Sequence, residues 1–361
     1  MQMRALAIAG TTLWLAMACA APAAPGATSK PAEDAPAAPA ASPSSAPAAP
    51  AELQKVRMAY AFVGQPTLPM WIALDQGIYR KHGLDVDATV MQTSAQVAPA
   101  MAAGEIDVAL TAGAGVVDVT LSGADQVLIE SDSNVLRFYL HSRPDIRRIE
   151  DLRDKRVAIT RLGSGVHLAT QIMLNKAGLE AGRDVQILQA GTVDAGLTAL
   201  ISGNADAAML GSAQHFIARQ QGYPLLVDTR DYQIPYMQGS LAVTRATLAS
   251  QYDMVRDFVR AHLEAVGLSK RDPALAKRLL RTELQIDEAD ALEFNYQYWL
   301  EELADPPYPP IAAVQTVLDQ RAEEIPAART ANPRDFVDDR VLRELEASGF
   351  MRQALGPPLQ R

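Results

Sequence analysis

The sequence predicts an α/β protein with largely parallel β-sheets. From residue 56 onward, segments with the composition of strands alternate with segments of helical periodicity. One pattern also occurs twice, at Ala100–Ala109 and at Ala199–Ala208: a helix, a glycine, a turn with aspartate and a strand of small residues. Glycine suits the left-handed end of a helix, and aspartate in a turn can accept hydrogen bonds from backbone amides. The repeat indicates two lobes that are built alike and face each other across a cleft.

The first half of the body is predicted to alternate strictly between strands and helices. The expected strands are Val56–Phe62, Leu84–Met91, Val108–Ala112 and Val127–Ser131. The expected helices are Leu68–Gln76, Tyr79–His82, Gln96–Ala103 and a segment from Gly113 to Gly123. Asn134–Ser142 is a candidate strand that passes from the first lobe to the second.

The second half repeats this alternation and then becomes helical. Its expected strands are Arg156–Thr160, Asp184–Gln189, Ala205–Leu210 and Leu225–Asp228, and its helices are Val166–Ala177, Ala195–Ser202 and His215–Gln221. Gly239–Arg245 is expected to return to the first lobe. The remaining helices are Ala249–Lys270, Pro273–Leu284, Glu288–Ala304, Ile311–Glu324 and Asp338–Gly349. The first lobe is thus predicted to comprise residues 53–138 and 243–361, and the second residues 139–242.

Residues 1–19 are predicted to be an export signal. Met1–Arg4 carries one positive charge, and the largely apolar Ala5–Ala18 is shorter than the ~20 residues that a membrane-spanning helix needs. Ala16-Met17-Ala18-Cys19 resembles the lipobox of bacterial lipoproteins, a family in which the cysteine is lipid-modified and becomes the mature N-terminus. Lipidation of Cys19 is therefore expected, and an ordinary cleaved signal is the alternative.

Residues 20–52 are predicted to be a disordered tether. Residues 20–50 contain 14 alanines and 8 prolines and no aromatic residue, so they cannot bury enough surface to offset their chain entropy. Proline-rich chain extends by ~3.1 Å per residue, which gives a reach of up to ~100 Å. We therefore expect a periplasmic or cell-surface protein that is lipid-anchored to a membrane.

The composition narrows the classes of partner. The net charge of −9 argues against nucleic acid, because nucleic-acid binding needs clustered lysine and arginine. Cys19 is the only cysteine, so disulfides and thiolate chemistry are not expected. No metal site or cofactor is expected either, because no short ligand spacing connects the five histidines, His82, His141, His167, His215 and His262.

Several segments together resemble the substrate-binding proteins of ABC importers. They are Leu68–Ala73, Gln76–Val86, Met101–Ala112, Asp151–Ala158, Ala177–Leu179 and Ser348–Phe350. In order and spacing they are similar to the nitrate, sulfonate, taurine and thiamine-precursor group (NMT1/THI5-like, SsuA-like), over roughly residues 54–350. The resemblance implies a type II periplasmic-binding fold, in which two α/β lobes are joined by two crossing strands. It also implies a protein, expected to be a monomer and not an enzyme, that closes on a small molecule and delivers it to a permease.

The loop Arg161–Gly165 is the sharpest candidate for the ligand site, because ligands of parallel α/β sheets bind beyond the carboxyl ends of the strands. Gly163 and Gly165 permit a tight turn with exposed amides, and Ser164 can cap a helix N-terminus, where anions bind well. Arg161 would add a forked donor for a sulfonate, carboxylate or phosphate. The alternative is a structural turn with a solvated Arg161.

Other candidate ligand contacts lie in the loops that correspond to this one and near the crossing strands. They are Gln65, Trp71, Thr111, Gly113, Tyr139, Gly211, Ser212 and Tyr236. Small residues there would let a ligand approach the backbone, although they also suit close helix–strand packing. Trp71 would form an apolar wall with Phe62, and Gln65 would add one amide to orient polar groups. Tyr139 and Tyr236 would contact a ligand near the hinge, although aromatic side chains are more often part of a core.

The sequence thus predicts a binding protein that captures a small, anionic organic molecule. One alternative is a ligand-sensing lipoprotein of the same fold, and another is an enzyme of thiamine-precursor or menaquinone-pathway type. Sulfonate, nitrate, a pyrimidine precursor and an aromatic carboxylate remain open as ligands.

Overall fold

The computed structural model describes residues 52–91, 94–322 and 324–358. The predicted signal, the lipidation site at Cys19 and the tether as far as residue 51 lie outside the described residues. In the part that is described, no helix is both long and apolar enough to cross a membrane.

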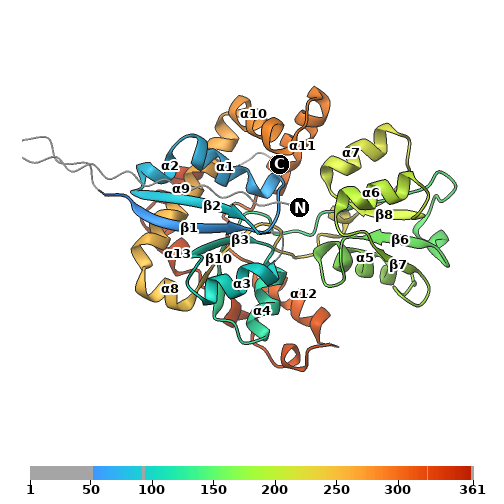
Figure 1. Cartoon of the computed structure of the whole chain (residues 1–361), viewed down its shortest axis with the longest axis horizontal. Helices are drawn as coiled ribbons and strands as arrows, with labels where there is room; N and C mark the ends of the chain where they lie inside the picture. Colours follow the sequence, from blue (N-terminus) through green and yellow to red (C-terminus); the bar gives the residue numbers. More distant parts are fainter. Residues whose placement is uncertain (1–51, 92–93, 323, 359–361) are drawn as a thin grey trace, which may run out of the picture. The chain divides into compact units, whose positions relative to one another are not determined.

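The described body is built on two five-stranded sheets with the same strand pattern (Figure 1). The first has the order β2-β1-β3-β10-β4, with β1 (Gln54–Tyr60), β2 (Leu84–Val90), β3 (Val108–Thr111), β4 (Gln126–Ser131) and β10 (Ser240–Thr244). The second has the order β7-β6-β8-β5-β9, with β5 (Tyr139–Ser142), β6 (Arg156–Ile159), β7 (Gln186–Gln189), β8 (Ala207–Leu210) and β9 (Leu225–Asp228). In each sheet only the fourth strand, β10 or β5, is antiparallel to its neighbours. The predicted α/β fold with largely parallel sheets and a repeated pattern is confirmed.

Two extended segments pass between the sheets and pair with each other. The first follows β4 and the second precedes β10, and they meet at the bridge between Val135 and Pro235. Backbone hydrogen bonds from Leu136 N to Ile234 O (2.9 Å) and from Tyr236 N to Asn134 O (3.1 Å) hold them together. The expected strand Asn134–Ser142 is therefore a sheet strand only from Tyr139 on. Strand β10 begins at Ser240, three residues before the predicted lobe boundary at residue 243. The exact boundary stays a prediction.

Helices cover both sheets (Figure 1). Most of the helices of the body accompany the first sheet and the segment after it: α1 (Leu68–Asp75), α2 (Ile78–Lys81), α3 (Ser94–Ala102), α4 (Gly113–Leu121), α8 (Arg245–Ser250), α9 (Tyr252–Arg271), α10 (Pro273–Leu284), α11 (Ala289–Glu302), α12 (Ile311–Arg321), α13 (Arg340–Ala347) and α14 (Phe350–Leu355). The second sheet carries α5 (Gly165–Lys176), α6 (Val193–Ile201) and α7 (Ser212–Gln220). Short 3₁₀ turns are η1 (Gln65–Thr67), η2 (Ile149–Leu152), η3 (Thr229–Tyr232), η4 (Pro326–Arg329) and η5 (Pro333–Phe336).

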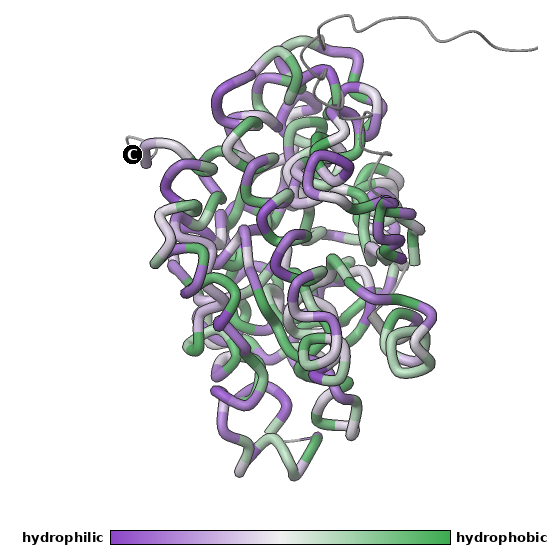
Figure 2. The backbone as a smooth tube through the Cα atoms, turned by 90° about the vertical axis from the view of Figure 1, so that its left-hand side faces the viewer, coloured by the Kyte–Doolittle hydropathy of each residue, from purple (hydrophilic) through white to green (hydrophobic). Residues whose placement is uncertain are grey.

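The core follows from the periodicity of these elements. Hydrophobic and hydrophilic residues alternate along most helices in Figure 2, as expected for helices with one buried face. One large cluster joins the first sheet to α1 and α9, and a second joins the strands of the second sheet to α5, α4 and α12. The second cluster therefore packs elements from both parts of the chain against the crossing segments.

The C-terminal helices differ from prediction in two places. The expected helix Ala249–Lys270 is two helices, because Gln251 leaves the helical region with φ −130° and ψ 40°. The expected last helix is followed by α14, which begins after Gly349 in the left-handed conformation (φ 80°). Helix α14 packs closely on α9, since a Cβ at Gly267 would lie 1.8 Å from the carbonyl oxygen of Ala354.

Candidate functional site

A cavity of about 830 Å³ lies at the carboxyl ends of the inner strands of both sheets. The loops that follow β1, β3, β6 and β8 line it. The lining residues are 61–66 after β1, Ala112, Ala114, Gly115 and Asp118 after β3, 161–166 after β6, and 211–214 after β8. Eight of the predicted ligand contacts are among its lining residues: Gln65, Arg161, Gly163, Ser164, Gly165, Gly211, Ser212 and Tyr236. Ligand contact by these residues stays a prediction, but the structure brings them to one place.

The loop before α5 forms the N-terminal cap that the sequence predicts. Ser164 Oγ accepts a hydrogen bond from His167 N (3.2 Å) and donates one to Arg161 O (2.7 Å). Gly163 has φ 77°, a left-handed conformation that favours glycine. At Gly165 a Cβ would lie 2.7 Å from the hydroxyl of Tyr236, so only glycine lets the second crossing segment approach α5. Two amides of the turn are already bonded, Leu162 N to Gln189 Oε1 (3.1 Å) and Gly163 N to His167 Nδ1 (3.0 Å), and the turn as a whole lines the cavity.

Arg321 is a buried arginine beside the cavity, and no pattern in the sequence singles it out. Its Nε and Nη2 donate to the two carboxylate oxygens of Asp118, at 2.6 and 2.9 Å, and Nη2 also donates to Gly163 O at 2.7 Å. The hydrogen bond to Asp118 is the main cause that raises the pKa of Arg321. Arg321 thus neutralises a carboxylate that lines the cavity and connects α12 and α4 to the loop of the second sheet.

Gln65 and Ser212 bond directly to each other. Gln65 Nε2 donates to Ser212 Oγ (2.5 Å) and to Asn295 Oδ1, and Ser212 Oγ donates to Asn295 Oδ1 (3.0 Å). All three residues are buried. Asn295 comes from α11, so this triangle holds together the loop after β1, the start of α7 and a C-terminal helix. Sequence reasoning missed Asn295, because it lies 230 residues from Gln65.

Four predicted ligand contacts do not line the cavity. Trp71 is buried in the core on α1, and Thr111 is buried as the last residue of β3. Gly113 starts α4, and a Cβ there would lie 2.6 Å from Cβ of Met237. Tyr139 is buried in β5. Close packing within the protein accounts for these four positions at this cavity. Ligand contact by them stays a prediction.

Tyr139 belongs to an aromatic cluster that includes two buried histidines. Its ring stacks on that of His215 with the ring centres 3.8 Å apart, and His215 Nδ1 lies 2.8 Å from His141 Nε2. Burial lowers the pKa of His141. Burial, followed by repulsion from His141, Arg219 and Arg137 and partly opposed by Asp228, lowers the pKa of His215 to about 4. Both imidazoles are therefore neutral near pH 7.

Replacement of His215 by glutamine is expected to flatten the acid side of the stability profile. Between pH 6.5 and 4, His215 becomes protonated in the unfolded chain but stays neutral in the folded protein. The free energy of unfolding therefore falls as pH falls. From pH 6.5 to 5.0 this amounts to about 2 kcal/mol in the wild type. Urea unfolding of the wild type and of His215→Gln at pH 7.5 and 5.0 measures this loss of stability. Equal losses of stability in the two proteins would contradict the prediction.

The cavity combines one lining arginine, Arg161, with three carboxylates. Asp118 is paired with Arg321, and Asp194 and Glu283 are exposed, so that water screens their charges. The first turns of α4, α5, α6 and α7 also line the cavity, and they offset the negative charge of these carboxylates. Helix N-termini present unpaired N–H groups and a partial positive charge, so the arrangement can hold an anionic group.

Comparison with known proteins gives one family and one fold. The family model described as "NMT1/THI5 like" matches residues 66–276. A comparison with curated proteins finds no match. Among solved structures, the chain is similar to the periplasmic aliphatic sulphonate binding protein SsuA from Escherichia coli, with 18% identity, a TM-score of 0.63, and coverage of 79% of this chain and 92% of that one.

Two further structures show the same likeness. The alkanesulfonate-binding protein SsuA from Xanthomonas axonopodis pv. citri, solved with bound MOPS, has 18% identity and a TM-score of 0.62, with coverage of 80% of this chain and 97% of that one. The periplasmic nitrate-binding protein NrtA from Synechocystis PCC 6803 has 13% identity and a TM-score of 0.66, with coverage of 84% and 90%. At these identities the likeness shows the fold alone, which is that of periplasmic binding proteins.

Proposed function

Because the chain belongs to the NMT1/THI5-like family, we propose that it is an extracytoplasmic solute-binding lipoprotein of an ABC importer. It captures a small anionic organic molecule in the cavity at the carboxyl ends of its two sheets and delivers the molecule to a membrane permease. No chemical conversion is part of this function. Lipidation of Cys19 would keep the protein near the permease.

The observation that carries the proposal is the convergence of four helix N-termini on one cavity. Ala112 and Gly115 come from the start of α4, Ser164 from α5, Val193 from α6 and Ser212 from α7. Each N-terminus contributes a partial positive charge and N–H groups that have no partner within the helix, although part of them are capped, as His167 N is by Ser164 Oγ. Four of them, from loops of both sheets, favour a compact anionic group such as a sulfonate or carboxylate over a cation.

Closure of the lobes is the mechanism that we propose for capture. A ligand shifts an open–closed equilibrium only through its different affinity for the two states. Contacts from loops of both sheets can supply this difference, because a group that touches one lobe alone binds equally in either state. The bonds from Gln65 to Ser212 and from Arg321 to Gly163 O also join elements of both sheets. Because these bonds need the two sheets close together, they are expected to lower the free energy of the closed state.

A thermal-shift screen tests the function. The purified protein is heated with an alkanesulfonate, an aminoalkanesulfonate, nitrate, a pyrimidine precursor, an aromatic carboxylate and a cationic amine of similar size. We expect one anionic class to raise the melting temperature, since a ligand that binds only the folded state stabilises it by mass action. X-ray scattering with that solute should then show a more compact body. A shift with the amine and with no anion would contradict the proposal.

A further inference from the structure

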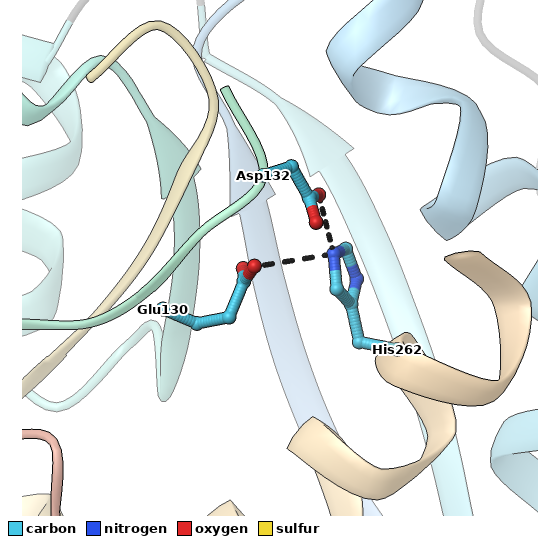
Figure 3. Close-up of side chains that lie close together, drawn as sticks. All are labelled: Glu130, Asp132 and His262. Atoms are coloured by element: carbon cyan, nitrogen blue, oxygen red, sulfur yellow. Dashed lines mark hydrogen bonds and ion pairs between the residues drawn. The ribbon is translucent and has the colours of Figure 1, made fainter. Parts of the chain in front are cut away.

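Three buried side chains with metal-ligating groups meet away from the cavity. Glu130 lies in β4, Asp132 begins the first crossing segment, and His262 comes from α9 (Figure 3). In extended chain, residues two apart point to the same face, so Glu130 and Asp132 both face the helix that carries His262. Of the residues in ranges 52–91, 94–322 and 324–358, these form the one group of three that could hold a metal ion. None of them lines the cavity.

The group is fully buried, and several of its polar atoms lack hydrogen-bond partners in the described residues. The exposed fraction of all three residues is 0%. His262 Nε2 lies 2.8 Å from Asp132 Oδ2 and 3.7 Å from Glu130 Oε2. Within the described part of the chain, neither carboxylate oxygen of Glu130 has a hydrogen-bond partner, nor does Asp132 Oδ1. Buried polar groups are nearly always paired, so these oxygens indicate a missing ligand.

Charge supports the same conclusion. Two carboxylates in a dry core are strongly destabilising unless a cation or a proton compensates them. Two compensations are therefore possible: a proton on Glu130, or a divalent cation whose charge balances both carboxylates beside a neutral imidazole.

The geometry points to the cation, and we propose that Glu130, Asp132 and His262 bind one divalent metal ion, best matched by Zn²⁺. Zinc takes tetrahedral nitrogen and carboxylate ligands at about 2.0–2.2 Å, which places neighbouring ligand atoms about 3.3–3.6 Å apart. The distances from His262 Nε2 to Asp132 Oδ2 (2.8 Å) and to Glu130 Oε2 (3.7 Å) lie just below and just above this spacing. All three ligand atoms lie within 4.8 Å of one another. Imidazole with two carboxylates favours zinc over calcium or magnesium, which prefer oxygen alone.

Tyr79 is positioned to support the site. Its hydroxyl is buried and has no hydrogen-bond partner in the described residues. Burial and the charge of Asp132 raise its pKa, so the hydroxyl keeps its proton. The Tyr79 ring stacks on Phe258, one helical turn before His262, with ring centres 4.9 Å apart. Tyr79 therefore adds a buried hydroxyl, unpartnered in the described residues, on a ring that packs on the helix of His262.

A metal ion at this site would stabilise both crossing segments where they join the first sheet, at the end of β4 and the start of β10. Asp132 N donates to Gly239 O (2.9 Å) in the second segment, and Asp132 O accepts from Ala304 N (2.6 Å) after α11. A metal ion on the Asp132 carboxylate would therefore hold β4, α9 and both crossing segments at one point. Such a site acts on the stability of the hinge, and not on the solute directly.

The test compares metal content and stability after refolding, because a fully buried site exchanges only when the chain opens. The wild-type protein is unfolded, refolded with ZnCl₂ or with EDTA, desalted and analysed for zinc. Two variants remove ligands, Glu130→Gln and His262→Gln. Asp87→Asn is the matched control, since Asp87 is an exposed carboxylate on β2 of the same sheet. Co²⁺ refolding of the wild type adds a spectroscopic test that needs no variant.

We expect one zinc per chain in the wild type and in Asp87→Asn, a lower melting temperature after EDTA, and a tetrahedral Co²⁺ spectrum. Glu130→Gln and His262→Gln should bind zinc more than about tenfold more weakly. With a shared proton in place of the metal, Glu130→Gln would raise the melting temperature and EDTA would change nothing. That result, or equal zinc in all four proteins, would overturn the proposal.

Discussion

Replacement of Ser164 by aspartate is expected to abolish the binding of an anionic solute while the protein stays folded. Aspartate can still cap α5, because its carboxylate accepts the hydrogen bond from His167 N that Ser164 Oγ now accepts. The new charge, however, faces the cavity where the solute would sit. Two like charges about 4 Å apart near a protein surface repel by about 4 kcal/mol, roughly a thousandfold in affinity.

Ser164→Asn is the matched control, because asparagine caps a helix equally well and carries no charge. Calorimetry with the solute from the thermal-shift screen should give affinities within about tenfold for the wild type and Ser164→Asn, and no measurable binding for Ser164→Asp. Melting temperatures of the three proteins should be similar. Equal affinity for the aspartate and asparagine variants would remove this loop from the site.

Replacement of Arg321 by glutamine is expected to lower both stability and anion affinity. Arg321 is buried, and its guanidinium holds Asp118 through two hydrogen bonds. Removal of one partner of a buried pair costs about 3–5 kcal/mol, and the 33% exposure of the Asp118 side chain reduces this to about 2–3 kcal/mol. The carboxylate left in the cavity wall would also repel an anionic solute.

A double-mutant cycle separates these two effects. Asp118→Asn in the Arg321→Gln background removes the uncompensated charge, so most of the affinity should return, and part of the stability with it. Asp118→Asn alone should bind the solute at least as tightly as the wild type. Urea unfolding and calorimetry on the four proteins measure the cycle. If the double variant binds no better than Arg321→Gln, then Arg321 acts on the solute in some way other than through Asp118.

Most of the regular elements follow from the sequence, because periodicity and glycine act over a few residues. The helix predicted at Pro273–Leu284 is observed with those limits, and Asp272 caps it through a hydrogen bond from Leu275 N. Gly163, Ser164 and Gly165 are sufficient to predict the turn before α5. The local rules missed the break at Gln251, whose φ is −130°, and the helix α14, whose close approach to α9 depends on the missing Cβ of Gly267.

Patterns within a few residues of sequence could not predict the contacts that form the cavity and the buried group of Glu130, Asp132 and His262. Arg321 and Asp118 are 203 residues apart, and His262 and Asp132 are 130 residues apart. One signal was available: Glu130 and Asp132 are acidic residues at the end of an otherwise apolar strand, and such residues need a buried partner. The identity of that partner could not be inferred from the spacing of the histidines.

The sequence by itself thus determined the α/β class, the repeated strand pattern and the loops that meet at the cavity, since hydrogen bonds and side-chain periodicity within a few residues specify them. Tertiary structure alone decided which lining residues are already bonded to one another, which aromatic residues belong to the core, and which buried charges meet. Those outcomes depend on the distances between side chains far apart in the chain, and only the packing of the two sheets and their helices sets such distances.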